Sequence, residues 1–242
     1  MSDKSKAWLG LGLGVLGGVA AAVIYLERIR PWHLQWGAKK EEVQSTYPGD
    51  DLILTPRIDA THAITIEAAP DDIWPWIAQI GQGRGGFYTY DWIENMMGLQ
   101  IKSADQVLPQ YQDVKVGDII PLEPGGGGPP VLDVEKYHYL LLGGKMDAQT
   151  EGIFRVNDPT PGAYMSVTWL FYLDPVSNNQ TRLIERFRVD WYPQNAKNWL
   201  MYHAFLEPGA FIMERGMLQG IKKRAEKLNQ EKPGWVKGEI PL

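Results

Sequence analysis

The sequence predicts an α+β domain in which a curved antiparallel sheet wraps around a long C-terminal helix, preceded by an N-terminal transmembrane helix. Three observations carry this prediction. A strand-like segment and two short helical segments are followed by several strands separated by turn sequences. An amphipathic helical pattern ends near residue 229, and an uncharged stretch covers residues 7–26. No parallel strand follows the first helix, which favours α+β over α/β.

Composition limits the classes of function. The 242 residues suffice for one domain with a sizeable core, and the 10 Trp and 11 Tyr suit a large core or an aromatic-lined pocket. The absence of Cys excludes disulfides, zinc–thiolate sites and thiol catalysis. The net charge is −5, and the excess of acidic residues lies beyond residue 44. An acidic main domain repels phosphate backbones, so we expect no nucleic-acid partner.

Residues 7–26 carry no charged side chain, and Lys and Arg flank this stretch on both sides. A helix of that length rises about 30 Å, which matches the hydrocarbon core of a bilayer. A cleaved signal peptide is one alternative, but the apolar run continues past the small residues at 20–22. A buried helix of a soluble protein is another, but such a helix would show a polar face. The sequence therefore predicts a single-pass membrane anchor over residues 1–30. The Lys and Arg on its C-terminal side favour a cytoplasmic main domain.

A stripe of small residues recurs every four positions in this segment, at Gly10, Gly14, Gly18 and Ala22. On a helix they share one face and let a second membrane helix approach closely. The alternative is that glycine is simply common in such segments. We therefore hypothesise that a partner membrane helix pairs with this segment through these four residues.

Residues 31–50, with Pro31, Gly37 and a turn sequence, are predicted to be a connector to a main domain over residues 51–230, with a tail over 231–242. Residues 61–69 alternate and are rich in β-branched side chains, which predicts a strand. A helix follows Pro70, because Asp72 can cap it and an apolar face runs to residue 80. A second short helix begins at Asp91 with a capping-box pattern and closes at residue 98.

The second half of the chain predicts strands and then helices. Residues 116–144 are interpreted as two strands around a Gly/Pro-rich loop, and residues 163–173 and 182–191 as a hairpin. Residues 195–206 and 208–229 are predicted to be helical. In the last segment Met213, Met217, Ile221, Ala225 and Leu228 trace an apolar stripe that can pack on the sheet.

The loop between the first two helices contains the spacing G-x-G-x-x-G at Gly81, Gly83 and Gly86. In a dinucleotide-binding turn this motif follows a strand and opens a helix within a parallel β-α-β unit. Here Gly81 ends a helix, and antiparallel strands follow. We therefore interpret the glycines as a corner between two helices and expect no nucleotide cofactor.

The segments "ITIEAAPDDIWPWIAQIG", "GQGRGGFYTYDWIEN", "TRLIERFR" and "FIMERGMLQGIKKRAE" resemble the SRPBCC superfamily, which includes START-like and polyketide-cyclase-like proteins. The resemblance covers roughly residues 50–230. It implies the helix-grip fold and a deep apolar cavity between the sheet and the C-terminal helix. The superfamily includes lipid carriers, hormone receptors and cyclases, so the resemblance does not settle activity.

The strand residues agree with such a cavity, because alternate apolar side chains of two strands face the same way. The implied cavity mouth lies at the loop between the first two helices. The predicted ligand-binding residues are Arg84, Tyr88, Trp92, Trp169, Phe171, Glu185, Phe187, Trp191, Met213 and Met217.

Glu185 is the unusual member of this set, because it lies on an apolar strand face. A buried carboxylate costs several kcal/mol unless it is paired or protonated. It is therefore predicted to be a ligand anchor or, in an enzyme, the acid or base. The alternatives are a structural ion pair with Arg84 or another nearby arginine, or a strand register that leaves Glu185 near the rim. Similarly, Arg84, Tyr88 and Asp91 either orient a ligand or tie their loop together.

The four histidines, His33, His62, His138 and His203, each stand alone, without a second His or an acid at zinc-ligand spacing. The sequence therefore predicts no metal site and no cofactor. A nucleophile-elbow motif is absent, and the glycines at 125–128 lack the Lys and Ser/Thr of a phosphate-binding loop.

Three functions stay open. The leading hypothesis is a membrane-anchored protein that binds a lipid or another hydrophobic small molecule. The second is a cyclase or dehydratase acting on a polyketide-like or isoprenoid substrate, with Glu185, Arg84 or Tyr88 as the acid or base. The third is a membrane-tethered assembly protein, which depends on the glycine stripe alone.

Overall fold

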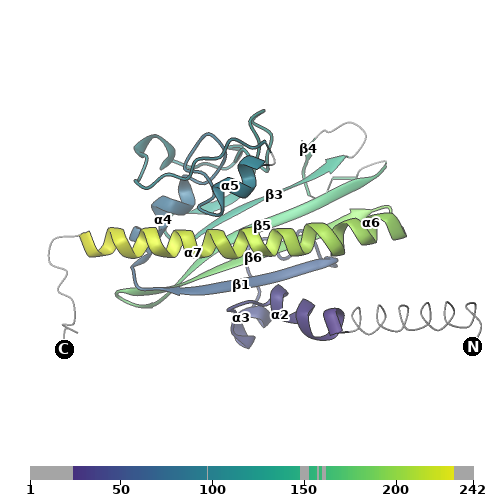
Figure 1. Cartoon of the computed structure of the whole chain (residues 1–242), viewed down its shortest axis with the longest axis horizontal. Coiled ribbons are helices and arrows are strands. Elements are labelled where there is room, and N and C mark those ends of the chain that lie inside the picture. Colours follow the sequence, from purple (N-terminus) through teal and green to yellow (C-terminus); the bar gives the residue numbers. More distant parts are fainter. Residues whose placement is uncertain (1–23, 97, 148–152, 157, 160–161, 232–242) are drawn as a thin grey trace, which may run out of the picture.

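The computed structural model describes residues 24–96, 98–147, 153–156, 158–159 and 162–231. All strand pairs in it are antiparallel, in the order β1-β6-β5-β3-β2, with β4 added to β3. The strands are β1 (Ile58–Ile66), β2 (Val131–Glu135), β3 (Tyr139–Asp147), β4 (Ile153–Phe154), β5 (Tyr164–Ser177) and β6 (Gln180–Tyr192). A long helix, α7 (Glu207–Glu231), runs across one face of this sheet (Figure 1). The predicted α+β fold, with a sheet gripping a C-terminal helix, is confirmed.

The main core lies between this face of the sheet, α7 and helix α4 (Pro70–Ala78). Strand alternation turns Phe171 and Leu183 toward α7, whose Met217, Leu218 and Ile221 are almost completely buried against them. The short helix α5 (Asp91–Met96) follows α4 along the chain. In Figure 1, α5 lies on the opposite side of α7 from β1. The apolar stripe predicted for the last helix therefore faces the sheet.

The region before β2 differs from the prediction. Residues 116–130 contain no regular strand. An isolated bridge joins Ile119 and Pro130, and a few backbone hydrogen bonds, such as Ile120 N to Pro129 O, cross the loop, whereas the regular hairpin is formed by β2 and β3. The physical reason is the density of prolines at positions 121, 124, 129 and 130, which lack the N–H that a strand ladder needs. A short 3₁₀ turn, η2 (Pro109–Tyr111), precedes this region.

The two predicted C-terminal helices are joined without a loop. Helix α6 (Ala196–Met201) continues through a π-helical turn, η3 (Tyr202–Leu206), into α7. The turn ends two residues before Pro208, whose missing N–H interrupts the regular helical hydrogen-bond ladder.

The N-terminal part of the described chain passes the edge strand β1 and contacts both faces of the sheet. It contains the π-helical turn η1 (Tyr25–Ile29), α2 (Arg30–Leu34) and α3 (Lys40–Gln44). After α2 the chain crosses the edge strand, where Ala63 N donates to Trp36 O over 3.1 Å. On the face away from α7, Arg182 Nε of β6 then contacts Glu42 Oε1 at 2.7 Å. The residues predicted as a connector are thus packed on the sheet.

The predicted membrane location is corrected by the structure. Among the described residues, no helix is long and apolar enough to cross a membrane. Helices η1 and α2 together extend over about 15 Å at 1.5 Å per residue. The rest of the predicted span, with the stripe Gly10, Gly14, Gly18 and Ala22, lies outside the described residues. This finding contradicts the predicted single-pass location.

Candidate functional site

Three buried titratable side chains meet between the sheet and α7: His62 of β1, Glu185 of β6 and Glu214 of α7. The Nδ1 atom of His62 lies 3.4 Å from Glu185 Oε2 and 3.2 Å from Glu214 Oε2. The exposed fractions are 1% for His62, 0% for Glu185 and 6% for Glu214. These three residues are referred to below as the acid–histidine cluster. Two carboxylates this deep require protons or a cation for compensation.

The fold brings the cluster together through strand register and helix docking. His62 and Glu185 are direct cross-strand partners in the β1–β6 pair, so both side chains emerge on the same face. Glu214 precedes the buried Met217 by three positions, which places it on the same side of α7. The cluster therefore follows from the same alternation that builds the core.

Two further hydrogen bonds orient the cluster. Trp169 Nε1 donates to Glu185 Oε1 over 2.6 Å. His62 Nε2 lies 2.8 Å from the carbonyl oxygen of His33 in α2. A carbonyl oxygen only accepts, so the Nε2 atom carries a hydrogen and Nδ1 faces the two carboxylates.

The cluster shifts the pKa values of His62 and Glu185. Burial by itself lowers the pKa of His62, but hydrogen bonds and charge from Glu185 and Glu214 outweigh it and raise that pKa well above the ordinary value. Burial, together with the charge of Glu214, raises the pKa of Glu185, while His62 and Trp169 oppose this rise. Without another cation, the cluster thus contains a His62 imidazole that favours its protonated form and a Glu185 carboxyl group that favours keeping its proton.

A void of about 10 Å³ adjoins His62 and Glu214. Its other walls are mostly apolar and come from β1, β6, α2 and α7, namely His33, Leu34, Ile58, Ala60, Phe187, Glu207, Ala210 and Phe211. A space of this size holds about one water molecule. At this position the deep cavity expected from the resemblance is closed, because α2 inserts His33 and Leu34 beneath α7.

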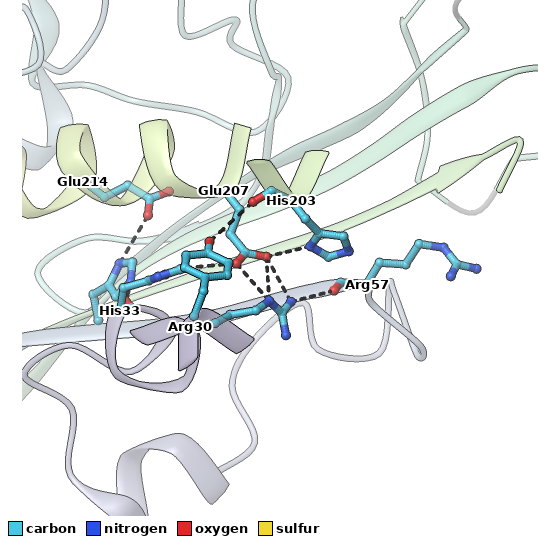
Figure 2. Close-up of polar contacts among 8 residues, drawn as sticks. Arg30, His33, Arg57, His203, Glu207 and Glu214 are labelled. Atoms are coloured by element: carbon cyan, nitrogen blue, oxygen red, sulfur yellow. Dashed lines mark hydrogen bonds and ion pairs between the residues drawn. The ribbon is translucent and has the colours of Figure 1, made fainter. Parts of the chain in front are cut away.

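Glu207, in the first turn of α7, fastens α2 to the rest of the protein (Figure 2). Its carboxylate accepts from Arg30 Nη2 over 2.9 Å and lies 2.9 Å from His33 Nε2 and 3.0 Å from His203 Nδ1. These four residues are referred to below as the Glu207 clasp. Burial raises the pKa of Glu207, but the hydrogen bonds from His33, Arg30 and His203 outweigh it, so the pKa lies below its usual value.

Three of the predicted ligand-binding residues lie at this site. Glu185 belongs to the cluster, and its partners are His62 and Trp169, both described above. Phe187 of β6 lines the void. The expected pairing of Glu185 with Arg84 is not among the contacts of the described residues.

Four other predicted ligand-binding residues lie on the same side of the sheet but away from this site. Phe171 and Met217 are 0% and 2% exposed within the main core. Trp191 stacks on Tyr202 with ring centroids 4.1 Å apart, and Met213 is half-buried on α7. A role for these residues in ligand binding stays a prediction.

The loop between α4 and α5 is held by contacts of its own. Arg84 Nη2 donates to Ala78 O over 2.8 Å, and its guanidinium lies 4.7 Å from the ring centre of Tyr111. Asp91 accepts from both the backbone N and the Oγ of Ser103, at 2.9 Å and 2.6 Å. The loop is therefore tied by these contacts, rather than by the expected Arg84–Asp91 pair.

Tyr88 and Trp92 differ sharply in exposure. Tyr88 is 3% exposed in the main core, and its hydroxyl donates to Trp76 O over 3.0 Å. Burial raises the pKa of Tyr88 far above its usual value. Trp92, at the start of α5, is 65% exposed. Tyr88 therefore has the environment of a core residue, and Trp92 that of a surface residue.

Sequence reasoning missed most of the polar residues at this site: His62 and Glu214 of the cluster, and the whole Glu207 clasp. Two signals were present. His62 alternates with Ile64 and Ile66 on one strand face, and Glu214 falls within the apolar stripe of the last helix. Each histidine does stand alone along the chain. In the fold, however, ligand atoms of His62, Glu185 and Glu214 lie within 4.8 Å of one another.

Comparison with known proteins gives similarity in structure only. No family model matches the sequence, and no curated protein matches it. A conserved protein from Geobacillus kaustophilus has a TM-score of 0.37 and 11% identity, covering 70% of this chain and 95% of its own. An aromatase/cyclase named Zhui from a Streptomyces species has a TM-score of 0.31 and 13% identity, covering 74% of this chain and 98% of its own.

A Polyketide_cyc-like protein from Corynebacterium glutamicum is also similar, with a TM-score of 0.29 and 13% identity over 71% of this chain and 89% of its own. Polyketide-cyclase-type proteins are thus among the structures that this chain is similar to. The arrangement of a sheet around a C-terminal helix rests on the strand order and on α7 of this chain itself.

Proposed function

We propose that the chain binds a neutral apolar small molecule that carries a hydroxyl or amine group, between the sheet and the N-terminal half of α7. One observation supports this most strongly: the acid–histidine cluster lies beside a void whose other walls are mainly apolar. A few placed polar groups within apolar walls are the usual form of a small-molecule site.

Apolar surface next to the void supports the proposal. Met165, Val167 and Phe187 lie beside the smaller core formed by α2, β1 and β6, yet each is only partly buried. Ile212 of α7 is 50% exposed. Apolar side chains that the protein leaves partly uncovered are suited to contact with an apolar ligand.

Helix α2 is the element that a ligand has to displace. The void holds about one water, so a larger molecule has to take the place of His33 and Leu34. The Glu207 clasp that fastens α2 consists of polar contacts. Trp32, at the centre of α2, is 58% exposed. Hydrogen bonds to charged groups contribute about 1.5–3 kcal/mol each, so the apolar contacts that the ligand gains have to offset a cost on the order of several kcal/mol.

The chemistry of the cluster selects the polar group of the ligand. An anionic head group would be a third buried acid beside the single imidazole of His62, which is costly, whereas a hydroxyl or an amine can donate to the carboxyl oxygens of Glu185 and Glu214. A long-chain alcohol is therefore expected to bind better than the fatty acid of equal length.

The test uses N-phenyl-1-naphthylamine, a neutral fluorescent probe, with the full chain. We expect the emission of the probe to rise on binding. A long-chain alcohol should reverse this rise more effectively than the matching fatty acid. Ala60→Leu fills the void from β1 and is expected to weaken probe binding by about tenfold or more, at a cost of about 1–3 kcal/mol in stability.

Ala204→Leu, at an exposed position of η3, is the matched control and should bind the probe as the wild type does. Should Ala60→Leu not fold, Ala210→Leu fills the same void from α7. Probe binding that is unaffected by filling the void from either side would contradict the proposal.

A cyclase-like reaction is the second candidate, because His62 and two carboxyl groups beside a void are suitable for moving a proton. It requires a substrate that reaches the cluster. Turnover of a polyketide-like or isoprenoid compound by the wild type, lost in Glu214→Gln with ligand binding retained, would favour the enzyme. Binding without any turnover would favour the binding protein.

A further inference from the structure

We infer that the acid–histidine cluster is a binding site for one divalent first-row transition-metal ion, with zinc as the ion that the donor set and spacing fit best. The protein ligands are His62 Nδ1, Glu185 Oε2 and Glu214 Oε2. This inference concerns the cluster alone and does not depend on the organic ligand proposed above.

The spacing of the three atoms is that of a metal site. At a metal–ligand distance of about 2.1 Å, two ligands at right angles are about 3.0 Å apart, and two at the tetrahedral angle about 3.4 Å apart. The two distances from His62 Nδ1 are 3.2 Å and 3.4 Å. All three donor atoms lie within 4.8 Å of one another, so a small ion contacts them with only slight side-chain movement.

The hydrogen bonds that surround the three proposed ligands are of the kind that orients ligands toward a metal ion. A metal-binding histidine usually donates its second ring N–H to a carbonyl or carboxylate, which fixes the tautomer and the ring orientation. His62 Nε2 makes such a contact with His33 O at 2.8 Å. Trp169 Nε1 holds Glu185 through Oε1, which leaves Oε2 directed at the cluster.

The charge of the cluster differs from that around other buried carboxylates of the chain. Glu42 is neutralised by Arg182 and Glu207 by Arg30, at 2.7 Å and 2.9 Å. Among the described residues, no Lys or Arg forms an ion pair with Glu185 or Glu214. A divalent cation supplies the positive charge that a guanidinium supplies at the other two positions.

The void supplies room for a further ligand. It is bounded by His62 and Glu214 and holds about one water molecule. Three protein ligands of the histidine and carboxylate type, together with one water, match the usual arrangement of a zinc ion at a reactive site. Oxygen and nitrogen donors without sulfur also suit Mn²⁺ and Fe²⁺, which the experiment separates.

The experiment titrates the full chain, stripped with a chelator, with Zn²⁺, Mn²⁺ or Co²⁺ alone. We expect one Zn²⁺ per chain by calorimetry, weaker binding of Mn²⁺, and the visible absorption of four-coordinate Co²⁺. Glu185→Gln and Glu214→Gln are each expected to reduce Zn²⁺ affinity by about 100-fold or more. Trp169→Phe removes only the hydrogen-bond donor to Glu185 and should reduce Zn²⁺ affinity by about tenfold.

Two control variants test whether zinc binds at a carboxylate or a histidine outside the cluster. Glu94→Gln removes a buried carboxylate of α5, and His138→Gln removes a surface His beside Glu135. Both should bind one Zn²⁺ as the wild type does. If the Gln variants of the cluster do not fold, the Co²⁺ spectra of the wild type and Trp169→Phe still report on the site.

Absence of stoichiometric metal binding by the wild type would overturn the inference. Unchanged affinity in both folded Gln variants would do the same. Neither result bears on the proposed function, because binding of the fluorescent probe is measured on the metal-free chain.

Discussion

Individual buried carboxylates in this protein are stabilised in different ways. Glu42 has a guanidinium partner, and Glu207 has a guanidinium and two imidazoles. Glu185 has Trp169 and one shared histidine. Glu94, which is 2% exposed in α5, has no basic partner among the described ion pairs. The protonation of each carboxyl group therefore depends on its immediate neighbours.

We predict that Glu94→Gln stabilises the protein at neutral pH. Burial, and then the charge of Asp91, raise the pKa of Glu94, although Thr89 opposes this rise. A carboxyl group with a raised pKa in the folded state favours unfolding at pH 7, because the unfolded chain loses the proton more readily. The neutral amide removes this penalty, so we expect a gain of up to about 1 kcal/mol, or about 2–4 °C in Tm.

Thermal unfolding of both proteins at pH 7 and pH 4 checks this prediction. The gain should shrink at pH 4, where the carboxyl group is protonated in both states. Glu231→Gln, on the exposed end of α7, serves as the control and should leave Tm unchanged. A lower Tm for Glu94→Gln at pH 7 would be inconsistent with a penalty from burial.

At the scale of elements, α7 depends on glycines for close packing. A Cβ atom at Gly220 would lie 2.0 Å from Tyr88 O, and one at Gly216 would lie 3.0 Å from the ring of Tyr90. The loop after α4 therefore crosses directly over α7 at these positions. This contact offsets the cost of about 1 kcal/mol that each glycine imposes within a helix.

We predict opposite effects for two glycine substitutions in α7. Gly220→Ala places a methyl group on backbone atoms, which cannot move easily, and should destabilise the protein by about 3 kcal/mol or more. Gly209→Ala meets nothing within 4 Å and should stabilise it by about 0.5–1 kcal/mol. Chemical denaturation of both variants measures the difference. Equal effects at the two positions would show that close packing does not govern the choice of glycine.

At the scale of the whole molecule, the N-terminal segment links both faces of the sheet. On the α7 side, α2 is fastened by the Glu207 clasp. On the other side, Glu42 pairs with Arg182, and Asp50 with Arg186 and Arg188 of β6. Closure of the space beneath α7 therefore depends largely on ionised carboxylates.

We predict that acid releases this segment. Burial raises the pKa of Glu42, but Arg182 and the backbone of Lys39 outweigh it, so its pKa, like that of Glu207, lies below the ordinary value of 4.5. A lowered folded pKa contributes stability that is present above the unfolded pKa and is lost as the pH falls through the folded pKa. Stability should therefore decrease below about pH 4.5.

Melting curves between pH 7 and pH 3 provide the measurement. Glu42→Gln should be less stable than the wild type at pH 7 by about 3 kcal/mol, because Arg182 loses its charged partner, and should show a smaller loss on acidification. An acid loss in Glu42→Gln as steep as in the wild type would rule out this carboxylate as a cause.

Local patterns were sufficient for much of the fold. Alternation predicted β5 and β6 within a few residues, and the apolar stripe predicted α7. The isolated acid on an apolar face marked Glu185 as unusual, and it proved to be completely buried. Of the two strands expected around the Gly/Pro-rich loop within residues 116–144, the first is not a regular strand, because prolines outweighed its apolar pattern.

By itself, the sequence determined the strands β1, β5 and β6, the C-terminal helix and the one carboxylate that contradicts its surroundings, because each depends on neighbours along the chain. Only the tertiary structure decided that His62 and Glu214 join Glu185, and that α2 closes the space beneath α7. His62 and Glu185 are 123 positions apart, and Arg30 and Glu207 are 177 apart. Contacts at such separations depend on which strands pair and where the helix docks on them, which the pattern of neighbouring residues along the chain does not encode.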